Sequence, residues 1–67
     1  MDKKCFVETM LSDTIVEATV WIDHLEYNED EEVVTVVCEN GCKYRVNVAC
    51  NSKAAIILDV IKEVLRH

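Results

Sequence analysis

The residues of this chain best suited to chemistry are its four cysteines and two histidines. Structural zinc sites usually take two pairs of cysteine or histidine ligands, and the two cysteines of a pair are often only two residues apart. Cys38 and Cys42 have three residues between them, and Cys50 is the only other cysteine in that part of the chain. A zinc site formed by Cys38, Cys42 and Cys50 is therefore a weak alternative, and we expect no metal and no other cofactor.

Catalysis has little support in the same residues. A catalytic cysteine needs a neighbouring base and a group that binds the oxyanion, normally in a cleft. His24 is the only internal histidine, and no motif links it to a cysteine. The single glycine, Gly41, excludes a glycine-rich phosphate loop, and the acidic run 29–32 lacks the glycine and the alternation of a calcium loop. We expect that the protein is not an enzyme.

The acidic residues are more informative because they are concentrated in one part of the sequence. The segment 5–42 contains no lysine or arginine and has a formal charge of −10, in a chain whose net charge is −6. Binding to phosphates needs clustered lysine and arginine, so we expect no direct contact with nucleic acid. The acidic residues of this segment are Glu8, Asp13, Glu17, Asp23, Glu26, Glu29, Asp30, Glu31, Glu32 and Glu39.

The length of 67 residues allows one hydrophobic core, so we expect residues 1–67 to form a single small acidic domain. Hydrophobic residues make up 51% and charged residues 30%, a balance typical of folded chains. The sequence has no apolar run long enough to span a membrane, and its first residues do not resemble a signal peptide. We therefore expect a cytoplasmic protein with reduced cysteines.

The clearest structural signal is Asn40-Gly41, which lies between two valine-rich runs and predicts a β-hairpin. A two-residue loop would mix apolar and charged side chains on both faces of the hairpin. A three-residue loop that starts at Glu39, with Gly41 in a left-handed conformation, places Cys38 opposite Cys42 and separates the two kinds of side chain better. We predict the three-residue loop. Its apolar face would contain Val34, Val36, Cys38, Cys42, Tyr44, Val46 and Val48.

The C-terminal segment 53–67 predicts an α-helix, with Asn51 or Ser52 as its N-cap. Apolar residues recur at the spacing of a helix that packs on a sheet, and basic residues lie in the last turn. Ile56 and Val60 fall outside this stripe, and we interpret them as the flank of a wide buried face rather than as an oligomer contact. The stripe consists of Ala54, Ile57, Leu58, Ile61, Val64 and Leu65.

The segment 14–27 is compatible with a helix or a strand. Thr14 and Glu17 have the spacing of a capping box, whereas the β-branched and aromatic residues of the segment favour a strand. Apolar and polar residues alternate over 16–23 as in a half-buried strand, so we predict a strand. Residues 3–11 fit a helix or an edge strand equally well. The resulting fold is of the α+β class: an antiparallel β-meander of about three strands with the C-terminal α-helix packed on one face.

On the predicted strand, Glu17 and Asp23 flank Trp21, and the chain then enters the acidic run 29–32. An aromatic side chain surrounded by carboxylates suits a groove rich in lysine and arginine, because the charges speed association and the ring provides desolvated contact area. We therefore expect a surface that binds a basic protein. Its candidate residues are Glu17, Trp21, Asp23, Glu26, Glu29, Asp30, Glu31 and Glu32.

The leading hypothesis is a non-enzymatic protein-binding module, an inhibitor or adaptor that docks on the basic, nucleic-acid-binding surface of a partner enzyme. By analogy only, small acidic inhibitors of phages and mobile elements, such as anti-CRISPR proteins, act in this way. The second hypothesis is a structural homodimer or assembly subunit that uses an exposed sheet face, and the third is a small zinc-binding domain. Salt-sensitive capture of a cationic partner would favour the first hypothesis, and a salt-insensitive dimer would favour the second. Metal analysis decides the third.

Overall fold

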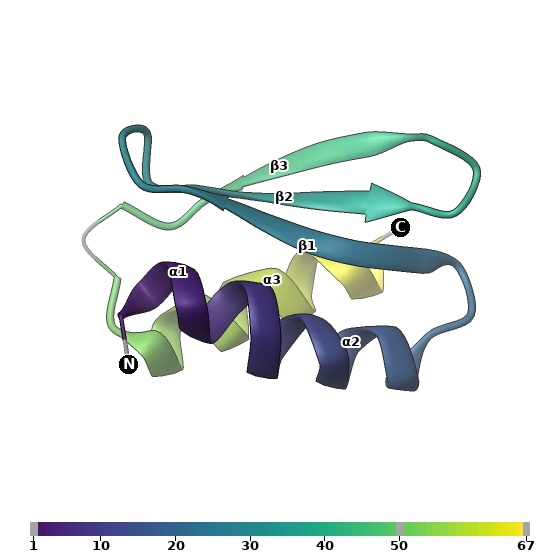
Figure 1. Cartoon of the computed structure of the whole chain (residues 1–67), viewed down its shortest axis with the longest axis horizontal. Helices are drawn as coiled ribbons and strands as arrows, with labels where there is room; N and C mark the ends of the chain where they lie inside the picture. The colour runs from purple at the N-terminus through teal and green to yellow at the C-terminus, as the bar shows by residue number, and fades with distance from the viewer. Residues whose placement is uncertain (1, 50, 67) are drawn as a thin grey trace.

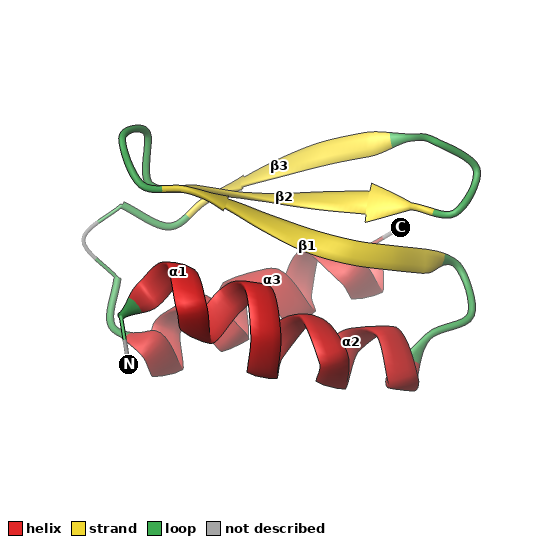
Figure 2. Ribbon diagram, in the orientation of Figure 1, coloured by secondary structure: helices red, strands yellow, loops and turns green. Residues whose placement is uncertain are grey.

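The computed structural model describes residues 2–49 and 51–66, in which two helices cover one face of a three-stranded antiparallel sheet (Figure 1, Figure 2). The strand order is β1-β2-β3, so the predicted α+β class, the meander and the C-terminal helix are confirmed. The elements are α1 (Lys3–Cys5), η1 (Phe6–Leu11), α2 (Ser12–Ala18), β1 (Ile22–Asn28), β2 (Val33–Cys38), β3 (Lys43–Asn47) and α3 (Lys53–Arg66).

The segments α1, η1 and α2 form one continuous helix, called here the N-terminal helix, whose middle part is a π-helix. Residues 3–11, which the sequence leaves undecided, are therefore helical. Asp2 caps this helix, because its Oδ1 accepts a hydrogen bond of 2.7 Å from the amide of Cys5. Apolar side chains at a spacing of four residues anchor the helix in the core, and these are Val7, Leu11 and Ile15.

The predicted strand over 14–27 is wrong in its first part. Residues 14–18 belong to α2, and β1 begins only at Ile22. Thr14 is not an N-cap, because its hydroxyl donates to the carbonyl oxygen of Met10 within the helix, at 2.8 Å. The helix prevails over strand propensity because each added residue extends an existing helix without a new nucleation cost, and because Ile15 continues its buried side.

The hairpin between β2 and β3 has the predicted three-residue loop. Val36 pairs with Tyr44, and the amide of Cys38 donates to the carbonyl oxygen of Cys42 at 2.8 Å. Gly41 has a φ of +90°, in the left-handed region that favours glycine. Cys38 and Cys42 are therefore cross-strand neighbours, although Cys38 is buried and Cys42 is exposed.

The helix α3 lies beside the N-terminal helix, but it turns a different side toward the sheet than the spacing predicts. Ile56 and Val60 are completely buried and Val64 is 7% exposed, whereas Leu58 and Leu65 are 58% and 80% exposed. Because α3 is apolar around much of its circumference, its apolar residues fit two overlapping helical stripes. The stripe that packs on the sheet consists of Ile56, Val60 and Val64, β-branched residues spaced four positions apart. Of the predicted stripe, only Val64 is buried, and Ile57 packs against the core from the side.

The core lies between the two helices and the inner face of the sheet. The buried residues of the sheet and its ends that face the helices include Ile22, Leu25, Val34, Val36, Val46 and Val48.

No helix within residues 2–49 and 51–66 is both long and apolar enough to cross a bilayer.

Candidate protein-binding surface

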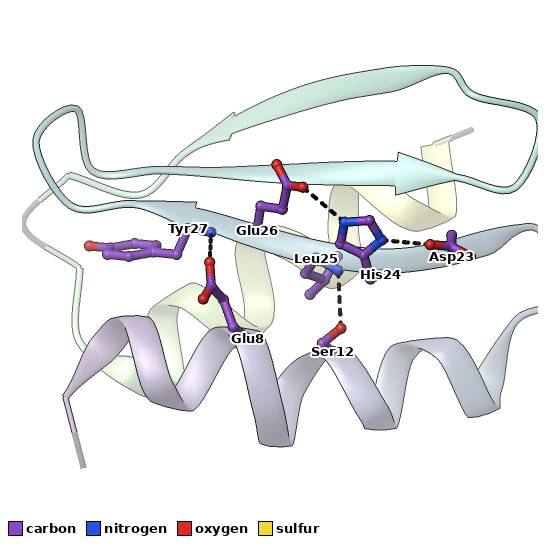
Figure 3. A network of polar contacts seen from close by, with 7 residues as sticks. All are labelled: Glu8, Ser12, Asp23, His24, Leu25, Glu26 and Tyr27. Atoms are coloured by element: carbon purple, nitrogen blue, oxygen red, sulfur yellow. Dashed lines mark hydrogen bonds and ion pairs between the residues drawn. The ribbon is translucent and has the colours of Figure 1, made fainter.

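The edge strand β1 is attached to the N-terminal helix through two polar side chains (Figure 3). The amide of Leu25 donates to Oγ of Ser12 at 3.0 Å, and the amide of Tyr27 donates to Oε2 of Glu8 at 2.9 Å. Glu8 and Ser12 are four residues apart, so they lie on the same side of the helix. They occupy amides of β1 that a further strand would need, so β1 is protected against pairing with another chain.

The outer sheet face, the side away from the helices, bears polar side chains on both outer strands. On β1, His24 and Glu26 project to this side (Figure 3). The middle strand β2 contains no charged residue, and its Thr35 pairs with Glu26 on one side and with Arg45 on the other. The outer sheet face is formed by His24, Glu26, Asn28, Val33, Thr35, Val37, Lys43, Arg45 and Asn47.

His24 bridges two carboxylates on this face. Its Nδ1 lies 2.6 Å from Oδ2 of Asp23, and its Nε2 lies 2.9 Å from Oε2 of Glu26. The hydrogen bonds to Glu26 and to Asp23 raise the pKa of His24 above its ordinary value, and the same bond to His24 lowers the pKa of Glu26. Both ring nitrogens donate in the charged imidazolium, so this geometry favours the protonated ring. About half of each side chain is exposed, so the ion pairs contribute little to stability.

The acidic run Glu29–Glu32 forms the loop between β1 and β2. The Oδ1 of Asn28 accepts hydrogen bonds from the amides of Asp30, at 2.9 Å, and of Glu31, at 3.0 Å, and so fixes the turn. Oε1 of Glu31 accepts a bond of 2.6 Å from Nη2 of Arg45 on β3. The first three residues of the run are exposed. The loop therefore has a fixed backbone that exposes Glu29, Asp30 and Glu31 to solvent.

Trp21 lies at the opposite end of β1 from this loop. Its ring stacks on Tyr44 with the ring centroids 6.5 Å apart, and it packs against the core. Its carbonyl oxygen accepts a hydrogen bond of 3.0 Å from the amide of Glu39 at the hairpin loop. At ~3.3 Å per residue, the seven residues of β1 separate Trp21 from the run Glu29–Glu32 by roughly 25 Å. The structure does not bring the aromatic ring and these four acids together.

The remaining candidates lie on neighbouring elements. Glu17 is exposed near the end of α2, and Asp23 and Glu26 are on β1. The structure adds Glu8 and Asp13 of the N-terminal helix to the acidic surface. Both belong to the acidic segment of the sequence, but neither is among the predicted binding residues. Only their charge pointed to this role, because nothing in the sequence spacing places the N-terminal helix beside β1.

The charged residues are divided between two sides of the molecule. The basic side is β3 and α3, with Lys43, Arg45, Lys53, Lys62 and Arg66, accompanied there by Asp59 and Glu63. The acidic side is the N-terminal helix, β1 and the loop that follows β1. Its lysine and arginine residues are confined to Lys3 and Lys4 in the first turn, and His24 lies among its carboxylates. The acidic side is formed by Glu8, Asp13, Glu17, Asp23, Glu26, Glu29, Asp30, Glu31 and Glu32.

Residues suited to metal binding are not gathered at one place. Within residues 2–49 and 51–66, no three histidine, cysteine, aspartate or glutamate side chains are placed to hold a metal ion. Cys38 and Cys42 are adjacent in the hairpin, and Cys50 lies outside the described residues. The structure therefore describes two members of the candidate zinc set.

Comparison with known proteins supplies no relative. No family model, no curated protein and no solved structure matches the chain. The chemistry of the surface is therefore the basis for assigning a function.

Proposed function

We propose that the protein is a non-enzymatic protein-binding module, an inhibitor or adaptor whose acidic side docks on the basic, nucleic-acid-binding surface of a partner protein. The observation that supports this proposal is the division of charge between two sides of the fold, with the acidic side formed by adjacent elements. The proposed setting is the cytoplasm, where the cysteines remain reduced.

The arrangement of the acidic side suits this role in two ways. Exposed carboxylates of one sign attract a cationic surface over a Debye length of about 10 Å at 0.1 M salt, which speeds association. His24 also holds the carboxylates of Asp23 and Glu26 in place, and Asn28 fixes the backbone of the loop that carries Glu29–Glu32. Fixed groups lose less conformational freedom on binding than mobile ones. Trp21, at the far end of β1, would contribute through its exposed part.

The test is capture of a partner followed by a charge-reversal comparison. The chain is immobilised in low salt and exposed to a lysate of the source cells or of cells infected by their viruses, and the bound protein is eluted with salt and identified. The affinity of the purified partner is then measured against ionic strength for the wild type, Glu29→Lys and Glu39→Lys. Both variants change the net charge equally, but Glu39 lies at the hairpin loop beside Trp21, at the opposite end of β1 from Glu29.

The proposal predicts that Glu29→Lys slows association and that Glu39→Lys has a smaller effect. The difference should shrink as salt is added, because exposed charges are then screened. A partner that is retained equally by both variants, or one whose binding does not respond to salt, would contradict docking through the acidic side. Trp21→Phe, which retains an aromatic ring on Tyr44, should weaken binding at every salt concentration if the indole is a buried anchor.

A further inference from the structure

The helical face, the side of the two helices that faces away from the sheet, exposes apolar side chains from both helices. Met10 is 56% exposed, Leu58 58%, Ile61 37% and Leu65 80%. A groove of about 180 Å³ runs between the helices and is lined by residues of both, including Met10, Ile57 and Ile61. Apolar residues gathered in this way mark an interaction surface more often than isolated exposed ones do.

The two sheet edges are less suited to self-association than this face. On β1, the amides of Leu25 and Tyr27 already bond to side chains of the N-terminal helix. On β3, pairing with the same strand of a second copy would bring Lys43 and Arg45 close to their own counterparts, and opposed like charges are destabilising. An association between two copies is therefore more favourable through the helices than through either edge of the sheet.

The two helices run in the same direction along the layer (Figure 1). Nζ of Lys53 lies 5.9 Å from the centroid of the Phe6 ring, so these two residues stand at the same level. At ~1.5 Å per residue in an α-helix, and somewhat less in the π-helical part η1, Asp13 is then level with Val60 or just before it, and Glu17 is about one turn further along, near Val64. Asp13 and Glu17 thus stand on either side of the level of Lys62.

The helical positions of Asp13 and Lys62 lie opposite the buried sides of their helices, although the Lys62 side chain also lines the groove between α3 and β3. Asp13 follows the buried Leu11 by two residues and Lys62 follows the buried Val60 by two residues, which is a rotation of about 200° around each helix. Leu58 precedes Val60 by two residues and lies near the same outward side. All three outward residues are exposed. The helical face therefore has an acidic half on the N-terminal helix and an apolar and basic half on α3.

We propose that the helical face binds a second copy of this chain, with the N-terminal helix of each copy packed on α3 of the other. A two-fold axis parallel to the helices produces this arrangement and preserves the level of each residue along the layer. Asp13 of one copy then lies opposite Lys62 of the other, and the contact occurs twice. An axis across the helices would instead place the two acidic helices against each other.

The helical face is also large enough for a dimer. An N-terminal helix of about 16 residues is roughly 24 Å long, and two packed helices are roughly 20 Å wide. A standard interface takes about 800 Å² from each partner, about one fifth of the 4255 Å² that is accessible on this chain. The molecule measures 29 × 19 × 18 Å, and the helical face runs along its longest dimension (Figure 1).

The first experiment measures mass by sedimentation equilibrium from about 10 µM to about 1 mM, the range in which weak dimers become populated. The wild type should approach twice the 7.7 kDa mass of one chain. Leu58→Glu should remain monomeric. The matched control is Val20→Glu, because Val20 is 87% exposed but lies in the bend after α2, and this variant should dimerise like the wild type. Circular dichroism of each variant establishes that it is folded.

The second experiment tests the arrangement by charge exchange. Asp13→Lys and Lys62→Glu should each weaken the dimer at least tenfold, because each places like charges opposite one another in both contacts. An equimolar mixture of the two variants should dimerise again, because both contacts of the mixed dimer then join opposite charges.

A wild type that stays monomeric at about 1 mM would overturn the dimer. A dimer that tolerates Leu58→Glu, or a mixture that shows no recovery, would overturn the packing of the N-terminal helix on α3. Neither result bears on the capture experiment for the acidic side, because that experiment depends on the loop after β1 and not on the helical face.

Discussion

Ile56 and Leu58 provide the sharpest test of which side of α3 stabilises the fold. They are two residues apart on one helix, and Ile56 is completely buried while Leu58 is 58% exposed. Replacement of either with alanine removes three carbon atoms, so the two variants are matched in size. The spacing of apolar residues assigns Leu58 to the core, whereas the structure assigns Ile56 to it. The two assignments predict opposite rankings of stability.

The expected magnitudes follow from burial. Three buried carbons contribute about 2.4 kcal/mol at ~0.8 kcal/mol each, and the remaining cavity adds to this, so Ile56→Ala should lower the free energy of unfolding by roughly 3–4 kcal/mol. Less than half of Leu58 is buried, so Leu58→Ala should cost about 1 kcal/mol. A domain of this length has a total stability of roughly 3–10 kcal/mol. Ile56→Ala therefore removes a large share of it.

The assay is urea denaturation at about 1 µM protein, so that self-association adds no stability by mass action. Circular dichroism and the fluorescence of Trp21, the only tryptophan, report unfolding. The midpoint should fall at least twice as far for Ile56→Ala as for Leu58→Ala. Equal shifts, or a larger shift for Leu58→Ala, would refute the orientation of α3 on the sheet.

Three further predictions concern one turn conformation, one backbone hydrogen bond and the His24 ion pairs. Gly41→Ala should cost about 1 kcal/mol or more through the left-handed φ of +90° alone, since no atom lies within 4 Å of the added Cβ, and an unchanged urea midpoint would contradict that conformation. Ser12→Ala should cost roughly 1–3 kcal/mol because the amide of Leu25 loses its acceptor, and hydrogen exchange at that amide should accelerate. The raised pKa of His24 stabilises the folded state fully below its unfolded pKa of 6.5, and this small contribution is lost as pH rises through the folded pKa. His24→Gln should therefore flatten the pH dependence of the urea midpoint above pH 6.5, and an unchanged slope would show that the two carboxylates do not hold the ring.

The hairpin was predictable because local and global signals agree there. Gly41 is the only glycine, and it supplies the left-handed residue that a three-residue loop needs. The same loop length places most of the apolar residues of the two strands on one face of the hairpin and the charged residues on the other. A register shifted by one residue would have exposed Val34 and Val36, which are completely buried. Burial and turn geometry therefore select one solution.

The N-terminal helix and the orientation of α3 could not be predicted because they depend on each other. Residues 14–18 have strand propensity, and only the helix that precedes them makes helix the lower free energy. That helix fills half of the layer beneath the sheet. It leaves α3 a side that faces the sheet, with Ile56 and Val60, and a side that faces the groove, with Ile57 and Ile61. A sequence pattern interpreted with a single helix on the sheet does not show which side of α3 contacts the sheet and which side faces the groove.

The candidate surface was predictable in composition but not in shape. The absence of bases over 5–42 is visible in the sequence, and the structure places most of the acids of that segment on adjacent elements. The position of Trp21 depends on where β1 begins. Because the strand starts after Trp21 and not at residue 14, the ring and the run Glu29–Glu32 lie at its two ends.

The meander itself explains why the order of charges along the chain becomes an arrangement in space. Neighbours in sequence are neighbours in the sheet, so an acidic first strand, an uncharged β2 and a basic β3 produce a charge gradient across the molecule. The N-terminal helix bonds to β1 and extends the acidic side into the helical layer. In the proposed dimer, the charges of the helical face are paired, while the carboxylates of β1 and the loop Glu29–Glu32 stay exposed on each copy. Such a dimer presents these exposed carboxylates twice, so under the proposed function it would bind a partner that repeats its basic surface more tightly than a single chain does.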